Sequence, residues 1–475
     1  MSGYRHGVYV SEIPTSIIPP AEALAGLPVV VGTAPIHLLK NPKVNEPVLC
    51  YSYKEAVEAF GYSDDFESYT LCEFIKSHFT LFSVAPVVFI NVLDPAKHKD
   101  EVEETTKAVV EGEVIIEEPV ISSTVVVKSS TDTGLNLGED YELAFNEKGH
   151  LIVSITDGGT EQIKIAYTKL TPTTVTDDDV IGSVGLDGKL TGFELVNEVL
   201  PRFGLIPGQL LAPKFSANPT VAAVMVSKAS NINGHFKCMA LTDIPVEHTP
   251  TYTSVTEWKN SNNYVYENQI ACWPKVRLGD DIYHMSTQLA GLMCKVDASY
   301  DGVPYVSPSN HTLQINGLVG KDGKEVILSI DQANYLNGQG VVTAINFSGG
   351  WKAWGNRTAC YPSVTDPKDA FIPVKRMFYW IATTIVQTFW QKVDAPITRR
   401  LIDTVMDSVN IWLNGLTASE YILGGRVEFL EEENPSTSIM DGNIKFHLYL
   451  TPPSPAREID FVLEYDVEYL KALFA

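Results

Sequence analysis

Short apolar runs alternate with helical segments between residues 28 and 242, and this alternation restricts the fold more than any other feature of the sequence. Residues 28–32, 87–92, 209–212 and 236–242 are apolar over a length typical of a buried strand. Strands that are separated by helices predict one parallel sheet covered by helices. The expected fold class is therefore α/β.

The helical segments carry recognisable start and stop signals. Ser52 stands three residues before Glu55, which is the spacing of a capping box, and Gly61 follows as a helix stop. Further helices are expected near residues 66–82, 193–203 and 220–229.

A change of composition interrupts the alternation between residues 96 and 185. This segment holds 18 acidic residues against 7 lysines and no arginine, hence a net charge of −11 out of −23 for the whole chain. Its β-branched runs at 121–128 and 151–156, with Asp-Gly turn signals nearby, predict strands. We expect a small acidic β domain inserted into the α/β domain.

The pattern changes again towards the C-terminus. Residues 371–393 predict a long amphipathic helix, and Asp394 is expected to cap a second helix that ends at Gly415. Residues 417–420 have the spacing of another capping box. Alternating apolar and polar residues at 444–450 and 459–467 predict strands. An α+β C-terminal domain is therefore expected.

These patterns divide the chain into four parts. The apolar start of the chain contains a short candidate strand and is then broken by Pro14, Pro19 and Pro20, so it has little to pack on by itself. The expected parts are an N-terminal arm (1–27), an α/β domain (28–95 with 186–360), an inserted β domain (96–185) and a C-terminal α+β domain (361–475).

Charge and composition exclude several classes of protein. A net charge of −23 argues against a general surface for nucleic acid or for an anionic membrane. No apolar run reaches the roughly 18 residues of a membrane span, and the first residues lead into no signal-peptide core, so synthesis in a cytoplasm is expected. The six cysteines form no C-x-x-C pair and are expected to be buried thiols.

Motifs for chemistry are weak. Residues 317–324 are rich in glycine but lack the spacing of a phosphate-binding loop, and Asp322-Gly323 favours a hairpin turn instead. The histidines are dispersed, and no G-x-S-x-G motif occurs. Asp243, at a strand end, is one candidate carboxylate, with His235 or His284 as its partner, although a capping role is favoured. We expect no catalytic residue, cofactor or metal.

The most unusual local string surrounds Trp351 and Trp354, which we expect to share a packing face at a domain junction. Together with residues 335–344 the string 349–358, GGWKAWGNRT, strongly resembles the contractile tail sheath family. Residues 6–12, 302–310 and 371–377 are similar to the same family and occur in its order along the chain. The family includes sheaths of phage tails and of R-type bacteriocins such as diffocins and pyocins.

The resemblance implies a non-enzymatic subunit with a subtilisin-like α/β sheet and extended terminal arms. It implies helically stacked hexameric rings around an inner tail tube, with the baseplate and a tail terminator as further partners. Assembly is expected in the bacterial cytoplasm, and the product is a virion tail or an extracellular particle. Contraction on a baseplate trigger would drive the tube through the target envelope. The inserted domain would face outward.

Two groups of residues are expected to make these contacts. The terminal arms would exchange strands with neighbouring subunits through Val8, Tyr9, Val10, Ile459, Phe461, Leu463, Tyr465 and Val467. Between residues 368 and 400 six basic residues face two acidic ones, an excess suited to an acidic tube. The candidates for this tube contact are Lys375, Arg376, Lys392, Arg399 and Arg400.

Two alternatives from other classes remain open at this point. An α/β hydrolase would use Asp243 with a nearby histidine, and its activity would disappear on Asp243→Ala. A cell-surface adhesin would use the acidic β segment 96–185 to bind its host, so deletion of the segment would abolish that binding.

Overall fold

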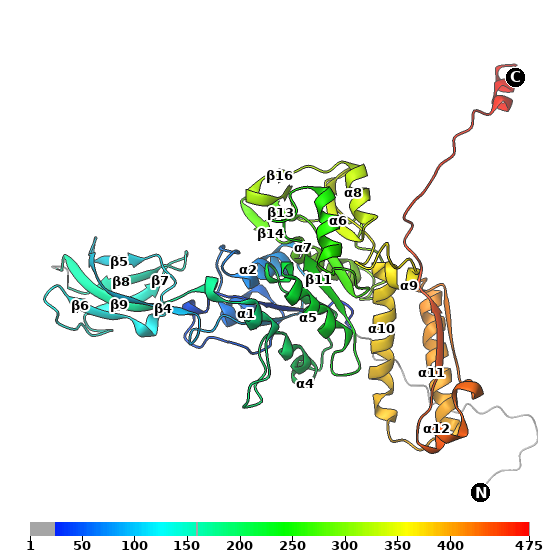
Figure 1. The fold of residues 1–475 in the computed structure, drawn as a ribbon, viewed down its shortest axis with the longest axis horizontal. Helices are drawn as coiled ribbons and strands as arrows, with labels where there is room; N and C mark the ends of the chain where they lie inside the picture. The colour runs from blue at the N-terminus through cyan, green and yellow to red at the C-terminus, as the bar shows by residue number, and fades with distance from the viewer. Residues whose placement is uncertain (1–23, 158–159, 475) are drawn as a thin grey trace, which may run out of the picture.

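The computed structural model describes residues 24–157 and 160–474, so the predicted strand around Val8, Tyr9 and Val10 lies outside the described residues. At its centre is an eight-stranded sheet in the order β18-β17-β12-β11-β10-β1-β3-β2 (Figure 1). The predicted strands are parallel, as expected: β1 (Pro28–Gly32), β3 (Val87–Asn91), β10 (Gln209–Leu211) and β11 (Met239–Asp243). Two further parallel strands, β12 (Gln269–Cys272) and β17 (Val341–Asn346), were not predicted.

Both edges of this sheet differ from the expected parallel order. At one edge β2 (Val48–Cys50) pairs antiparallel with β3, and at the other β18 (Trp351–Trp354) pairs antiparallel with β17. The fold is therefore a mixed α/β arrangement. All five residues of β1 are buried, because a central parallel strand is covered on both faces.

The helices around the sheet begin and end at the expected kinds of residue. The Ser52 hydroxyl accepts a hydrogen bond from the Glu55 amide, and Gly61 ends the helix with a positive φ. The expected helix at 66–82 is α2 followed by a π-helical turn (Lys76–Leu81). The helices of this region are α1 (Tyr53–Phe60), α2 (Thr70–Ile75), α4 (Val199–Phe203), α5 (Pro219–Ser230), α6 (Tyr252–Ser261), α7 (Met285–Ala298) and α8 (Ile330–Asn337).

A smaller sheet lies beside the carboxyl end of β12. Its order is β14-β13-β15-β16, all antiparallel, and the glycine-rich stretch 317–324 forms the β15–β16 hairpin, as its Asp-Gly dipeptide predicts. The strands are β13 (Lys275–Leu278), β14 (Asp281–Tyr283), β15 (Gly317–Val319) and β16 (Glu325–Val326).

Between β3 and the next helices the chain forms a separate β unit at one end of the molecule (Figure 1). Two three-stranded sheets, β4-β9-β6 and β5-β8-β7, enclose their own hydrophobic cluster. The unit starts and ends at one place, since Lys99 pairs with Leu170. Its strands are β4 (Lys99–Ala108), β5 (Glu113–Ile116), β6 (Val126–Ser129), β7 (Tyr141–Phe145), β8 (Leu151–Ile155) and β9 (Gln162–Leu170). Helix α3 (Asp177–Ile181) follows.

At the opposite end of the molecule two long antiparallel helices pack against a two-stranded sheet (Figure 1). Val405, Val409 and Leu413 of the second helix form a cluster there with Met377 and Trp380 of the first. The elements are α9 (Pro367–Ala370), α10 (Ile372–Phe389), α11 (Arg399–Ala418), α12 (Ser436–Met440), β19 (Gly424–Glu428) and β20 (His447–Thr451).

Three local predictions in this C-terminal part are wrong. Asp394 has a positive φ in the turn between the helices, and the side chain of Thr398 caps α11 instead. Residues 417–420 start no helix, because the Thr417 hydroxyl donates back to the Leu413 carbonyl within α11. Residues 459–466 form no strand within the chain, since no other strand of the described residues lies beside them.

Candidate assembly surfaces and buried polar clusters

Asp243 lies at the carboxyl end of β11, where the hydrolase alternative requires it, but its bonds are those of a helix cap. Its carboxylate accepts hydrogen bonds from the Ser286 amide at 3.0 Å and from the hydroxyls of Ser286 and Ser216. Because Ser286 lies in the first turn of α7, Asp243 holds the positive end of that helix. Burial raises the pKa of Asp243, while the nearby His284 and the Ser286 bonds oppose this shift.

His284 is the residue before α7, and it is bound to a different carboxylate. Its Nδ1 lies 2.8 Å from Glu73 Oε2, and its backbone amide donates to Glu73 Oε1 at 2.6 Å. Burial alone would lower the pKa of His284, but the Glu73 carboxylate raises it above the ordinary value. The pair joins α2 to the start of α7, so Glu73 and Asp243 together hold one helix end.

The hydrolase constellation is therefore not assembled in the described residues. Neither Ser216 nor Ser286 is hydrogen-bonded to His284, and both hydroxyls donate to Asp243 instead. The other candidate, His235, packs edge-on against Trp390 with 5.2 Å between ring centroids. Among the described residues neither serine therefore has the histidine base of a Ser-His-Asp triad.

All six cysteines are free thiols; five are buried, as predicted, and Cys294 is half-buried. In the described part of the chain no group of three His, Cys, Asp or Glu side chains is placed to hold a metal ion. None of the described helices combines the length and the apolar character needed to cross a membrane.

Two of the expected tube contacts are interior residues. Arg376 is 3% exposed and forms a two-pronged ion pair with Asp297 of α7, with one N–O distance of 2.9 Å. Lys375 is 9% exposed and binds Asp369 at 2.7 Å. Both side chains are packed inside this chain and are not surface contacts, because a charge count cannot tell which face of a helix packs inward.

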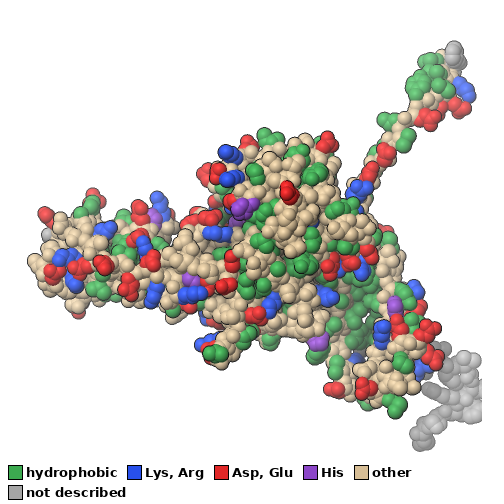
Figure 2. Space-filling model, in the orientation of Figure 1, with side chains coloured by type: hydrophobic (Ala, Val, Ile, Leu, Met, Phe, Trp, Pro, Cys, Tyr) green, Lys and Arg blue, Asp and Glu red, His purple; other side chains and the backbone are tan. Residues whose placement is uncertain are grey.

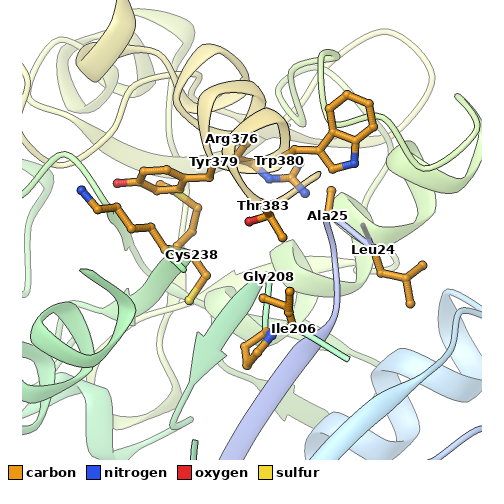
Figure 3. Close-up of a pocket in the computed structure, with 12 residues that line it drawn as sticks. Leu24, Ala25, Ile206, Gly208, Cys238, Arg376, Tyr379, Trp380 and Thr383 are labelled. Carbon is orange, nitrogen blue, oxygen red and sulfur yellow. The ribbon is translucent and has the colours of Figure 1, made fainter. Parts of the chain in front are cut away.

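This ion pair sits at the junction between α10 and the α/β region. Figure 3 shows Thr383 of α10 facing Gly208 and Ile206, Tyr379 on the side of Cys238, and Trp380 on the opposite side, with Leu24 and Ala25 also lining the pocket. A bidentate arginine–carboxylate pair fixes both distance and orientation, so it sets the position of α10 on the α/β region.

The other three basic candidates lie at the turn between α10 and α11. Arg399 and Arg400 are exposed, and Lys392 is half-buried. Arg399 has only an exposed partner, Asp403, one helical turn away at 3.1 Å. The turn lies at the same end of the helix pair as the β19–β20 connection, and the arm leaves from the opposite end (Figure 1).

The C-terminal arm leaves the molecule after β20 and makes few contacts with its own chain. Its apolar side chains are exposed: Ile459 69%, Phe461 81%, Leu463 94%, Tyr465 76% and Val467 63%. Figure 2 shows green hydrophobic side chains gathered at the tip of the arm, far from the body. A soluble chain rarely exposes so many apolar groups together unless they bind something.

The two-stranded sheet before the arm is incomplete. On β19 the Asn410 side chain bonds to both the amide and the carbonyl of Val427, which occupies that edge. The outer edge of β20 has no partner strand among the described residues. An open edge of this kind accepts an extended segment through main-chain hydrogen bonds.

Trp351 and Trp354 do not share a packing face. Both lie in β18, where residues three apart point to opposite faces of the sheet. Trp351 packs against the main core, whereas the Trp354 indole donates to Asn334 of α8 at 2.9 Å. Predicting a shared face assumed helical spacing, which the extended backbone does not have.

Known proteins with similar sequences include tail sheath proteins of phages. The chain is 28% identical to the tail sheath protein of Burkholderia phage BcepMu, over 99% of both chains. It is 24% identical to the tail sheath protein of Escherichia phage P2, over 66% of this chain and 76% of that protein. No family model matches the chain.

Solved structures share the fold at low sequence identity. The sheath complex of the extracellular contractile injection system PVC, in its contracted state, superposes with a TM-score of 0.60 at 14% identity, over 98% of this chain and 99% of that one. The contracted helical sheath of the anti-feeding prophage gives a TM-score of 0.57 at 15% identity, over 98% and 100%. The chain thus resembles tail sheath proteins in sequence, one of them along its full length, and it shares the fold of contractile injection system sheaths.

Proposed function

We propose that the chain polymerises as helically stacked hexameric rings around an inner tail tube and shortens when the baseplate signals. Its similarity to tail sheath proteins supports a structural, non-enzymatic sheath subunit of a virion tail or a tail-like particle. The observation that carries the finer proposal is the C-terminal arm: exposed apolar residues follow directly on an incomplete sheet.

Strand exchange explains both the exposed apolar residues of the arm and the open edge of the sheet. The arm at 459–467 has alternating apolar side chains but no sheet of its own, while the outer edge of β20 has no strand. We infer that the arm of one copy, and the N-terminal residues Val8, Tyr9 and Val10, extend the β19–β20 sheet of neighbours. Such head-to-tail contacts need not close on themselves, so they generate a helix.

The two ends of the molecule suit opposite surfaces of a cylinder. The β unit at 96–185, with a net charge of −11, lies at the far end from α10 and α11 (Figure 1). We propose that this unit faces outward and that Lys392, Arg399 and Arg400 face the tube protein. Individual exposed ion pairs contribute less than about 1 kcal/mol, so a tube contact made of them can release as rings move.

Similarity to tail sheath proteins also suggests further partners and a place of assembly for this chain. A solved structure of the anti-feeding prophage baseplate contains a chain of this fold. We infer contacts with a baseplate and a tail terminator, and assembly in the bacterial cytoplasm before release. The α/β region would be a subtilisin-like scaffold without catalysis, in which Asp243 caps α7.

Negative-stain electron microscopy of the purified chain, alone and with its tube protein and baseplate, tests the proposal. Hollow striated cylinders are expected, with a shortened form after release from the baseplate. A chain that remains monomeric with all these components present would overturn the assembly proposal.

A further inference from the structure

Arg357, the next-to-last residue of the GGWKAWGNRT string, has no role in assembly through the arms. The Arg357 guanidinium contacts two aromatic rings, with its carbon 4.3 Å from the Tyr361 ring centroid and 3.7 Å from that of Phe371. Contact with two rings restrains the planar group and leaves its N–H groups available to a ligand.

That edge has no carboxylate within the described chain. Arg357 takes part in no hydrogen bond or ion pair there, although the chain has 58 acidic residues against 35 basic ones. A second guanidinium, that of Arg457, lines the same pocket. Burial, and to a lesser extent the charge of Arg457, lowers the pKa of Arg357. Two positive groups therefore converge in an acidic protein.

The pocket around Arg357 is polar. Asn334, Asn356 and Ser309 contribute to its wall, and the first residues of the C-terminal arm, Pro455 to Glu458, form another side. Arg457 binds the adjacent exposed Glu458 at 2.9 Å, so its charge is already partly balanced. Arg357 remains the preorganised anion-binding group of the site.

We propose that this pocket receives a carboxylate side chain from a second copy of the chain and so locks adjacent subunits at the base of the arm. The inference rests on the proposed polymer, in which the arm leads from the pocket wall to a neighbour. A neighbour's surface therefore lies close by, and a chain with a net charge of −23 offers many carboxylates.

Zero-length cross-linking tests the occupant directly. Arg357→Lys places a primary amine in the pocket, and a carbodiimide joins an amine only to a carboxylate in contact with it, with loss of one water. Polymers are grown from an equal mixture of ¹⁴N and ¹⁵N chains with the tube protein. The expected result is a cross-link from position 357 to Asp or Glu in a peptide of the other isotope.

Other outcomes overturn the inference. A cross-link only to Glu458 of the same isotope would make the site an internal clasp, and no cross-link at position 357 in intact polymers would leave it without a carboxylate partner. If the unsubstituted chain formed no polymer with its tube, the proposed function itself would fail, and this inference with it. Normal cylinders without a cross-link at position 357 would overturn this inference but leave the proposed function intact.

A second measurement uses variants that keep the aromatic cage. Arg357→Gln should raise the subunit concentration left in the supernatant after ultracentrifugation about tenfold, as expected for the loss of one charge-assisted contact. Arg202→Gln is the matched control, because Arg202 is exposed and pairs with Glu198 of its own chain. Equal supernatant concentrations for the two variants, both folded by circular dichroism, would contradict the proposal.

Discussion

The inserted β unit and the C-terminal β unit are both small sheets attached to one α/β region, yet they differ in how their edges and apolar faces are covered. The insert encloses ten buried residues between two three-stranded sheets. The C-terminal sheet has two strands, mostly half-buried, and leads into an arm of exposed apolar residues. One unit is complete within a single chain, and under the proposed strand exchange the other is completed by further copies.

The largest effect that this difference predicts is loss of assembly when the arm becomes polar. Phe461→Ser with Leu463→Ser should abolish cylinders in electron micrographs, because the donated strand loses its apolar contacts. The melting temperature of the monomer should not change, since both side chains are solvent-exposed in it.

Leu186→Ser is the matched control for that experiment. Leu186 is also a fully exposed apolar residue, but it lies outside the arm. Cylinders are expected with this control. If the arm variant assembled as well as the control, the C-terminal unit would be as self-sufficient as the insert.

A cavity in the insert should damage stability but not assembly. Leu151 is fully buried in the cluster of the insert, so Leu151→Ala should destabilise that unit by about 2 to 5 kcal/mol. Hydrogen exchange would show faster exchange for β5 to β9, while cylinders still form. Loss of cylinders together with the insert's protection would show that the insert supports the polymer.

The joint of the insert provides a pH-dependent test. Asp179 binds Lys97 and His98, just before β4, and accepts hydrogen bonds from Thr176. Burial alone would raise the pKa of Asp179, but these bonds lower it from 3.8 to about 2. Since a depressed carboxyl pKa stabilises the fold only above the unfolded value, this stabilisation is lost as the pH falls from about 4 to 2.

Asp179→Asn should therefore lower the free energy of unfolding by about 1 to 2 kcal/mol at neutral pH. It should also weaken the decrease of stability with falling pH below about pH 4. Melting temperatures between pH 2 and pH 6 check this, with the neighbouring exposed Asp178→Asn as control. An unchanged acid dependence in Asp179→Asn would show that the joint does not depend on this carboxylate.

The smallest effect on assembly is expected from removing the insert altogether. Lys99 and Leu170 are paired neighbours, so replacing residues 99–170 with a two-glycine link leaves the α/β chain ends in place. Cylinders should form normally and contract. Normal assembly with loss of host attachment would favour an adhesive role for the insert, whereas failed assembly would contradict its outward position.

Local patterns in the sequence were sufficient for the strand and helix types of the α/β region. Apolar runs gave β1, β3 and β10 because a central parallel strand must be apolar on both faces, and Ser52 with Gly61 marked the ends of α1. The antiparallel edges β2 and β18 were not predictable, because strand direction depends on where a connection returns rather than on composition.

The sequence by itself determined the α/β core, the separate acidic segment and, through its motifs, the resemblance to the sheath family, because each depends on local spacing and order. Only the tertiary structure decided which charges are interior. Asp297 meets Arg376 across 79 positions and Glu73 meets His284 across 211, and no local signal links such residues. The open edge of β20 and the aromatic contacts of Arg357 also became visible only in the structure, because both depend on which surfaces the folded chain leaves uncovered.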